Sequence, residues 1–208
     1  MSEHTNKGFW ERFAFLYTRF MKKNDRTYEA ICHEITPLLH SDMSVLELAC
    51  GTGQLSFRLC DRVKNWLATD YSPNMIGEAK KNRAHTNIQF SVADATDLSY
   101  DAHSFDAVVI ANALHIMPEP EVALKEVRRV LKPNGILFAP TFVYEPGYQK
   151  IKIWLMEKVG FHTFHKWTAQ EFAAFVMQQG YAVEHIKLLK GNPLSECFLV
   201  GRISDRAV

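Results

Sequence analysis

The strongest constraint on this chain is an alternation of short apolar runs with segments of helical pattern between residues 43 and 145. The apolar runs lie between turn-forming residues, which is typical of buried strands. Strands that alternate with helices form βαβ units, in which helices cover both faces of a parallel sheet. The runs expected to be strands are VLEL, NWLATD, NIQFSVAD, FDAVVIANAL and GILFAPTFVY.

The last third of the chain departs from this alternation. A helical pattern covers residues near 148 to 159, and Thr168 and Glu171 have the spacing of a capping box at the start of a second helix. The runs YAVEHIKLL and SECFLVGRI are separated by Lys-Gly-Asn-Pro, which predicts an antiparallel hairpin at the edge of the sheet.

Composition indicates a single globular domain of 208 residues, with 47% hydrophobic residues and 24 Lys and Arg against 23 Asp and Glu. This balance, without a basic run, gives no reason to expect a nucleic acid partner. No stretch is apolar enough to span a bilayer and the start lacks the pattern of a signal peptide, so we expect a cytoplasmic protein. The four cysteines lack metal-binding spacing, so no metal site is expected. The expected organisation is one domain over 1–208, with a helical cap at 1–42, a core at 43–145, and an insertion with the closing hairpin at 146–208.

The first expected strand ends in an unusual turn, VLELACGTG, at residues 45 to 53. In an open parallel sheet a ligand lies outside the carboxyl ends of the strands, where this turn would be. Gly51 and Gly53 allow sharp bending and close approach of a ligand to the main chain. A tight turn without a ligand would explain one of these glycines more easily than both.

A cationic nucleoside fits this turn better than a dinucleotide does. A dinucleotide site requires a third glycine where Ser56 stands, and Glu47 would repel a pyrophosphate. Asp70 and Asp94 end the second and third expected strands, where carboxylates can accept ribose hydroxyls and an exocyclic amine. A single acid at a strand end is commonly a helix cap or solvated; three at successive strand ends favour a ligand.

Several motifs in this order resemble the class I S-adenosylmethionine-dependent methyltransferases, of the small-molecule type that acts on quinones or phospholipids. They are ELACGTG, DYSPNMI, ADATDL, ANALHIMPEP and LKPNGILF. The resemblance implies an α/β fold, a Rossmann-like three-layer sandwich whose seven-stranded, mostly parallel sheet has a reversed C-terminal hairpin and is covered by N-terminal lid helices. It also implies S-adenosylmethionine as the cofactor.

The resemblance further implies which residues surround this cofactor. Glu47 would face the methionine ammonium and Asp70 would hold the ribose, while Ala49 replaces the first glycine of the family pattern. The full implied set is Glu47, Ala49, Gly51 and Gly53 with Asn112 along the methionine part, Asp70 at the ribose, and Tyr71, Met75, Asp94 and Ala95 around the adenine.

Methyl transfer from a sulfonium is an in-line displacement, so the protein mainly has to align the acceptor with the methyl group. A base is useful only if the acceptor must lose a proton, as a thiol, a phenol or an enolisable carbon would. His115 follows the fourth expected strand and is the candidate catalytic base. The alternative is a histidine that packs the loop or bonds the main chain.

The acceptor side is expected to be aromatic. Residues 9–23 have a helical period with one broad aromatic face, which is compatible with ordinary packing, with a lid over the site, or with a peripheral membrane contact that we do not favour. The candidate acceptor contacts are Tyr17, Phe20, His115, Tyr144, Trp154 and Phe161. Such a lining favours a small apolar or aromatic methyl acceptor.

Two other functions compete with methyl transfer. A protein that binds the cofactor without catalysis would keep the same acids and glycines and act as a partner or regulator. A nicotinamide dehydrogenase is disfavoured by Ser56 and Glu47. The acceptor atom and the oligomeric state are left open.

Overall fold

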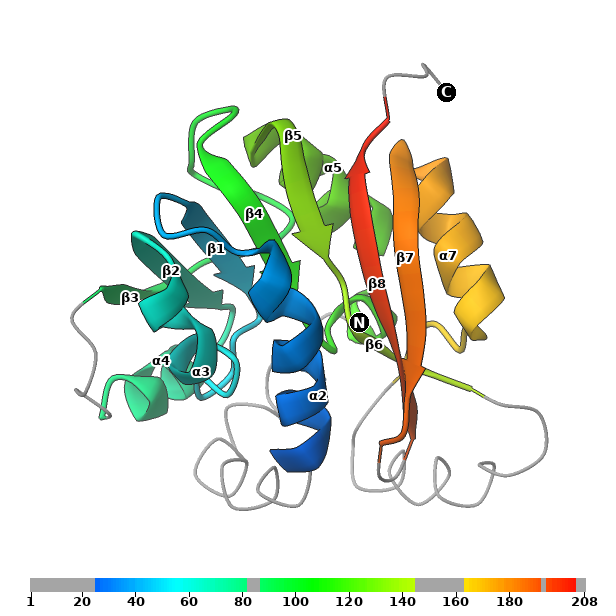
Figure 1. Ribbon diagram of the computed structural model, residues 1–208, viewed down its shortest axis with the longest axis horizontal. Coiled ribbons are helices and arrows are strands. Elements are labelled where there is room, and N and C mark those ends of the chain that lie inside the picture. Colours follow the sequence, from blue (N-terminus) through cyan, green and yellow to red (C-terminus); the bar gives the residue numbers. More distant parts are fainter. Residues whose placement is uncertain (1–24, 82–86, 145–162, 192–193, 205–208) are drawn as a thin grey trace.

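The structure is a computed structural model that describes residues 25–81, 87–144, 163–191 and 194–204 (Figure 1). Within these ranges eight strands form one sheet in the order β3-β2-β1-β4-β5-β8-β6, and β7 pairs with β8. The strands are β1 (Ser44–Leu48), β2 (Asn65–Asp70), β3 (Ile88–Val92), β4 (Phe105–Ile110), β5 (Leu131–Phe138), β6 (Thr141–Val143), β7 (Tyr181–Leu189) and β8 (Ser195–Ile203).

The strand directions confirm a mostly parallel sheet with a reversed C-terminal hairpin. All pairings among β1 to β5 are parallel, whereas β8 runs antiparallel to both β5 and β7. In Figure 1 the arrowheads of β1, β4 and β5 point downward and that of β8 points upward. The carboxyl ends of the parallel strands and the start of β8 therefore share one edge of the sheet, which we call the carboxyl edge.

The described sheet has one strand more than the expected seven because the fifth strand is interrupted. Phe138 pairs with Val200 of β8, and Thr141 pairs with Cys197 farther along the same strand. Between them the Ala139 N–H still donates to the Leu199 carbonyl of β8, whereas Pro140 faces the β4 side, where it has no N–H to donate and its carbonyl accepts the Asn112 N–H. β6 thus continues the line of β5 along β8.

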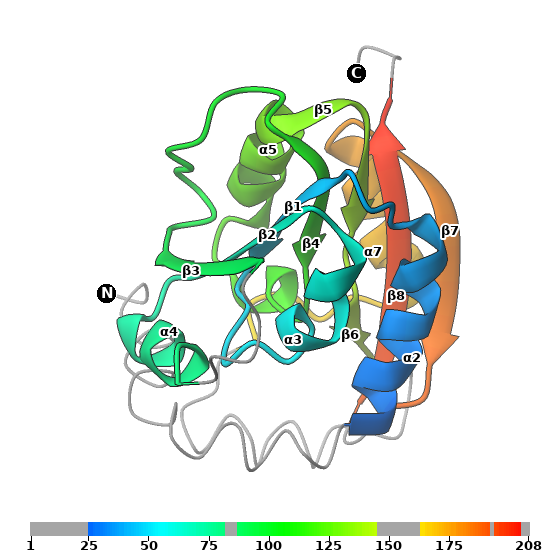
Figure 2. The same ribbon diagram turned by 60° about the vertical axis from the view of Figure 1, so that its left-hand side comes forward.

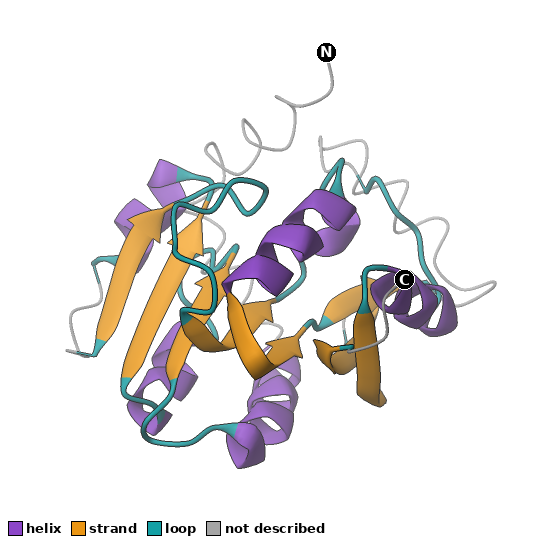
Figure 3. Cartoon of the chain, turned by 90° about the horizontal axis from the view of Figure 1, so that it is seen from above, coloured by secondary structure: helices purple, strands orange, loops and turns teal. Residues whose placement is uncertain are grey.

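Helices cover both faces of the sheet, as the alternation predicts (Figure 3). They are α2 (Asp25–Ile35), α3 (Ser56–Leu59), α4 (Pro73–Ala79), α5 (Pro120–Val130) and α7 (Ala169–Gln178). Apolar side chains of α2, α3 and α4 form one buried cluster with one face of the sheet, and those of α5 and α7 form the other cluster. In Figure 2 α2 lies in front of β8, and Lys187 of β7 donates a hydrogen bond to Glu34 of α2 at 2.6 Å.

The local sequence explains where these helices begin. Ser72 caps α4 by accepting the N–H of Met75, and Pro73 occupies the first turn, where no N–H is required. The predicted capping box at Thr168 and Glu171 is confirmed, because each side chain accepts the main-chain N–H of the other residue.

The predicted helices at residues 9–23 and near 148–159 lie outside the described residues. The proposed boundaries of cap, core and insertion stay predictions. None of the described helices is long and apolar enough to cross a membrane.

Candidate active site

The three strands expected to hold a ligand end together at the carboxyl edge. Leu48 of β1 is in register with Ile110 of β4, and Asp70 of β2 is in register with Val92 of β3. The turn that starts at Ala49 follows β1 between its two neighbours. The sheet thus brings together the glycine turn and the ends of β2 and β4, as expected.

The glycine turn has a backbone that requires its residue types. Ala49, Gly51 and Gly53 have φ values of 54°, 56° and 87°, in the left-handed region that favours glycine. A Cβ on Gly53 would lie 2.6 Å from the Phe57 ring. Only glycine therefore fits at position 53.

Asp70 fastens this turn to the end of β2. Its Oδ2 accepts the Gly51 N–H at 2.8 Å, and its Oδ1 accepts the Ser72 N–H at 2.9 Å. Burial raises the pKa of Asp70, although both N–H groups act to lower it. A carboxylate has about four lone-pair sites, so the two bonds leave acceptor capacity for a ligand hydroxyl.

Glu47 is a buried carboxyl beneath the turn, on the α3 side of the sheet. Its Oε2 accepts hydrogen bonds from Ser56 Oγ and, at 2.8 Å, from Trp66 Nε1. Burial raises its pKa to about 7, against the lowering effect of both donors, and nearby Asp70 raises it further. Sequence reasoning did not identify these partners, since Ser56 was considered only as a missing glycine. Contact of Glu47 with a ligand ammonium stays a prediction.

The residues expected around an adenine lie on adjacent loops. The Ala93 N–H donates to the Asp70 carbonyl at 3.1 Å, which joins the loops after β2 and β3. Asp94 Oδ1 accepts the N–H and the hydroxyl of Thr96, at 2.9 and 2.6 Å. Tyr71 is half exposed, whereas Met75 and Ala95 are buried.

Asn112 follows β4 and reaches across the carboxyl edge to β8. Its φ is 53°, its N–H donates to the Pro140 carbonyl at 2.8 Å, and its Nδ2 donates to Glu196 Oε1 at 3.0 Å. Burial raises the pKa of Glu196 to about 7, against the lowering effect of Asn112. Sequence reasoning missed Glu196. The available signal was a lone acid in the apolar run SECFLVGRI, at the start of a reversed strand.

His115 is enclosed by protein in the short 3-10 helix η4 (Leu114–Ile116). Only 1% of the residue is exposed, its Nδ1 lies 3.1 Å from Thr141 Oγ1, and its ring packs edge-on against Phe142. Its carbonyl accepts the N–H groups of Phe164 and His165. Burial, with a smaller effect of His165, lowers its pKa to about 3. These contacts correspond to the packing alternative, and the base role stays a hypothesis.

Of the other expected acceptor contacts, Tyr144 lies in the described chain. Its hydroxyl bonds Thr163 Oγ1 at 3.2 Å, and its N–H donates to the Trp167 carbonyl at 2.9 Å. Trp167 stacks on His165 with ring centroids 4.7 Å apart. The remaining candidates lie outside the described residues: Tyr17, Phe20, Trp154 and Phe161.

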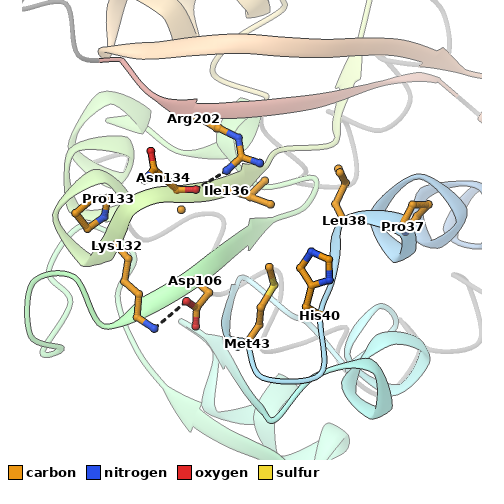
Figure 4. Close-up of a pocket in the computed structure, with 11 residues that line it drawn as sticks. Pro37, Leu38, His40, Met43, Asp106, Lys132, Pro133, Asn134, Ile136 and Arg202 are labelled. Carbon is orange, nitrogen blue, oxygen red and sulfur yellow. Dashed lines mark hydrogen bonds and ion pairs between the residues drawn. The ribbon is translucent and has the colours of Figure 1, made fainter.

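A hollow of about 380 Å³ lies at the opposite edge of the sheet, near the amino ends of β4 and β5 (Figure 4). Lys132 and Asp106 form an ion pair of 2.8 Å beside it, and Arg202 donates to the Asn134 carbonyl. Ligands of open parallel sheets lie at the carboxyl ends of the strands. We therefore assign no cofactor role to this hollow.

Comparison with known proteins relates this geometry to one family. A family model described as a methyltransferase domain matches residues 46–139. The chain is 36% identical over 121 residues to the ubiquinone/menaquinone biosynthesis C-methyltransferase UbiE of Rhizobium meliloti, covering 55% of this chain and 47% of that protein. It is 31% identical over 146 residues to the demethylmenaquinone methyltransferase of Staphylococcus aureus, covering 64% of this chain and 61% of that protein.

A solved structure supports the fold independently. A putative methyltransferase of Haloferax volcanii, determined in complex with the Trm112 methyltransferase activator, superposes with a TM-score of 0.82 at 17% identity. The superposition covers 97% of this chain and 99% of that one. The chain spans about half the length of the first curated relatives that it matches.

Proposed function

We propose that this chain, whose residues 46–139 match a methyltransferase domain model, transfers a methyl group from S-adenosylmethionine to a small aromatic acceptor of the quinol type. The observation that carries the proposal is the hydrogen bond from Gly51 to Asp70, because it joins the glycine turn to the acid expected at the ribose. Relatives named as quinone methyltransferases support the acceptor class.

The residues at the carboxyl edge fit a cationic nucleoside. Gly51 has no side chain and a φ of 56°, so a ligand can approach its main chain closely. Asp70 has acceptor capacity for ribose hydroxyls, and the negative charges of Asp70 and Asp94 favour a cation over a pyrophosphate. When bound, the cofactor supplies a methyl group that is already activated on sulfur.

The task of the chain is then to hold this molecule and to align the acceptor. Alignment of two reactants can contribute roughly 7–11 kcal/mol to lowering the barrier. The acceptor would lie beyond Asn112, toward the segment where Tyr144 bonds Thr163 and Trp167. The stacked rings of His165 and Trp167 in that segment support an aromatic acceptor.

Cofactor binding tests the first half of the proposal. Asp70→Asn should weaken S-adenosylmethionine binding about tenfold or more, since hydrogen bonds to a charged group contribute about 1.5–3 kcal/mol. Asp42→Asn is the matched control because Asp42 is exposed just before β1, at the opposite edge. Calorimetry should show near-normal affinity for this control. Equal affinities of wild type and Asp70→Asn would refute the assigned ribose contact.

Transfer of a labelled methyl group tests the second half. The wild-type chain should methylate members of a panel of reduced naphthoquinols and benzoquinols, and should leave thiols and simple amines unmethylated. Cofactor binding without methylation of any panel member would favour the alternative, a binding protein without catalysis. That alternative is not favoured, because the named relatives are methyltransferases.

A further inference from the structure

A buried amide and carboxyl pair at the carboxyl edge has unused hydrogen-bonding capacity. Glu196 is 2% exposed, and its Oε1 accepts the Asn112 Nδ2–H at 3.0 Å. In the described part of the chain, Glu196 Oε2 and Asn112 Oδ1 are buried and have no hydrogen-bond partner. A buried acceptor left in this state costs about 1–3 kcal/mol. Such groups are uncommon in folded proteins, and a ligand that donates a hydrogen bond would satisfy them.

The position of the pair separates it from the cofactor turn. β8 is the third strand from β1 in the sheet order β1-β4-β5-β8. At about 4.8 Å per strand, Glu196 lies on the order of 14 Å from the start of the glycine turn. Asn112, at the end of β4, lies between the two. This places Glu196 on the acceptor side of the carboxyl edge.

The neighbours of Glu196 are apolar. It is in register with Phe142 of β6 on one side and with Leu189 of β7 on the other. Residues that pair directly across strands have their side chains on the same face of the sheet. A carboxyl between a phenylalanine and a leucine suits a ligand that combines an aromatic ring with one hydrogen-bond donor.

We propose that Glu196, held by Asn112, binds the hydroxyl group of an aromatic methyl acceptor and receives its proton during methyl transfer. In this step the O–H bond breaks and its proton moves to Glu196 Oε2. The electron pair left on the hydroxyl oxygen forms the O–C bond to the methyl carbon, while the methyl–sulfur bond breaks and its electrons stay on sulfur. The proposal deepens the proposed function and rests on it for the transfer step.

Binding of two matched probes tests the hydroxyl site without requiring the natural acceptor. 1-Naphthol donates a hydrogen bond through its hydroxyl, whereas 1-methoxynaphthalene has the same ring system and no donor. Calorimetry on the full chain saturated with demethylated cofactor should show that the wild type prefers 1-naphthol by about tenfold, as a hydrogen bond to a charged group implies. Glu196→Leu should bind the two probes about equally.

Further variants keep this test decisive. Glu196→Gln retains the shape of the side chain and the contact to Asn112, so it replaces the leucine variant in this test if that variant does not fold. Its preference for 1-naphthol over 1-methoxynaphthalene should be at least about threefold lower than that of the wild type. Glu184→Gln is the matched control, because Glu184 lies on β7 and is engaged with Arg202 at the surface. Glu196→Gln, which keeps the contact to Asn112, and Glu184→Gln should retain normal affinity for the demethylated cofactor.

The outcomes separate this inference from the proposed function. A wild-type chain without preference for 1-naphthol, or a preference that survives in both Glu196 variants, would overturn the hydroxyl site. Loss of S-adenosylmethionine affinity with an unchanged naphthol preference would also overturn it, and would assign Glu196 to the methionine ammonium. If Glu196 controls naphthol binding but no quinol is methylated, the hydroxyl site stands and the proposed acceptor class fails.

Discussion

At the residue scale, the structure requires unusual backbone conformations where the ligand is expected. Ala49 and Asn112 both have positive φ, at 54° and 53°, and both lie at the carboxyl edge. Left-handed backbone is costly for alanine and less costly for asparagine, and residues other than glycine that adopt it cluster at functional sites. The family resemblance identified Ala49 as replacing a glycine, whereas the bonds of Asn112 to Pro140 and Glu196 are made only in the folded chain.

Ala49→Gly should stabilise the protein. Removing the Cβ relieves about 1–2 kcal/mol of left-handed strain, and the greater freedom of glycine in the unfolded chain offsets about 0.4–1 kcal/mol of this gain. Urea denaturation should therefore show a net gain of about 0.5–1 kcal/mol. A loss of stability would mean that the Ala49 methyl group makes contacts that outweigh the strain.

Gly53→Ala should have the opposite effect. The new Cβ would lie 2.6 Å from the Phe57 ring at a φ of 87°, so we expect a loss of about 2 kcal/mol or more and weaker cofactor binding. Gly77→Ala is a matched control, because nothing lies within 4 Å of its added Cβ in α4. It should gain up to about 1 kcal/mol from helix propensity. Equal changes in melting temperature for Gly53→Ala and Gly77→Ala would refute the expected clash with Phe57.

At the element scale, local sequence signals located strand and helix starts but did not reveal how far each element extends. Ser72 and Thr168 cap the two helices that their sequence neighbours predict. The break at Pro140 was not predicted, because a proline interrupts a strand only where its missing N–H faces a partner. At Pro140 that side of the strand faces the segment after β4, whose Asn112 N–H donates to the Pro140 carbonyl and which is distant in sequence.

Thr168→Ala should destabilise the protein by about 1 kcal/mol through loss of the cap on α7. Both halves of the capping box depend on this residue and Glu171. Gln178→Ala, at the exposed end of the same helix, is expected to be neutral. Chemical denaturation should distinguish the two, and equal midpoints would show that the cap contributes nothing.

At the scale of the whole molecule, the fold buries acids that the chain by itself would leave ionised. Glu47 and Glu196 come from strands that are far apart in sequence, and burial raises the pKa of each to about 7. A bound cation or hydrogen-bond donor would offset part of the free-energy cost of burying these carboxyl groups in their ionised form. The ligand and the fold are therefore expected to stabilise each other.

The stability of the ligand-free protein should fall as the pH rises from about 5 to 8, because Glu47 and Glu196 ionise more readily in the unfolded chain than in the fold. The folded-state pKa of Glu196 lies above its ordinary value of 4.5. Its contribution to the free energy of unfolding is therefore complete below pH 4.5 and is lost as the pH rises past 7. The loss is at most about 3 kcal/mol per group. Urea titrations of wild type and Glu196→Gln at pH 5 and at pH 8 should show that the variant gains stability relative to wild type as the pH rises. A constant difference would refute the raised pKa.

The sequence by itself determined the fold class and most residues of the glycine turn, since these follow from periodicity and from local backbone requirements, and the cofactor was implied by the family that its motifs resemble. Asp70 was predictable for the same reason, because parallel strands must end at one edge. Only the tertiary structure brought Glu196 of β8 against Asn112 after β4, and only burial enclosed His115 between Thr141 and Phe142. Long-range pairing and desolvation depend on the complete packed sheet, and no local pattern encodes them.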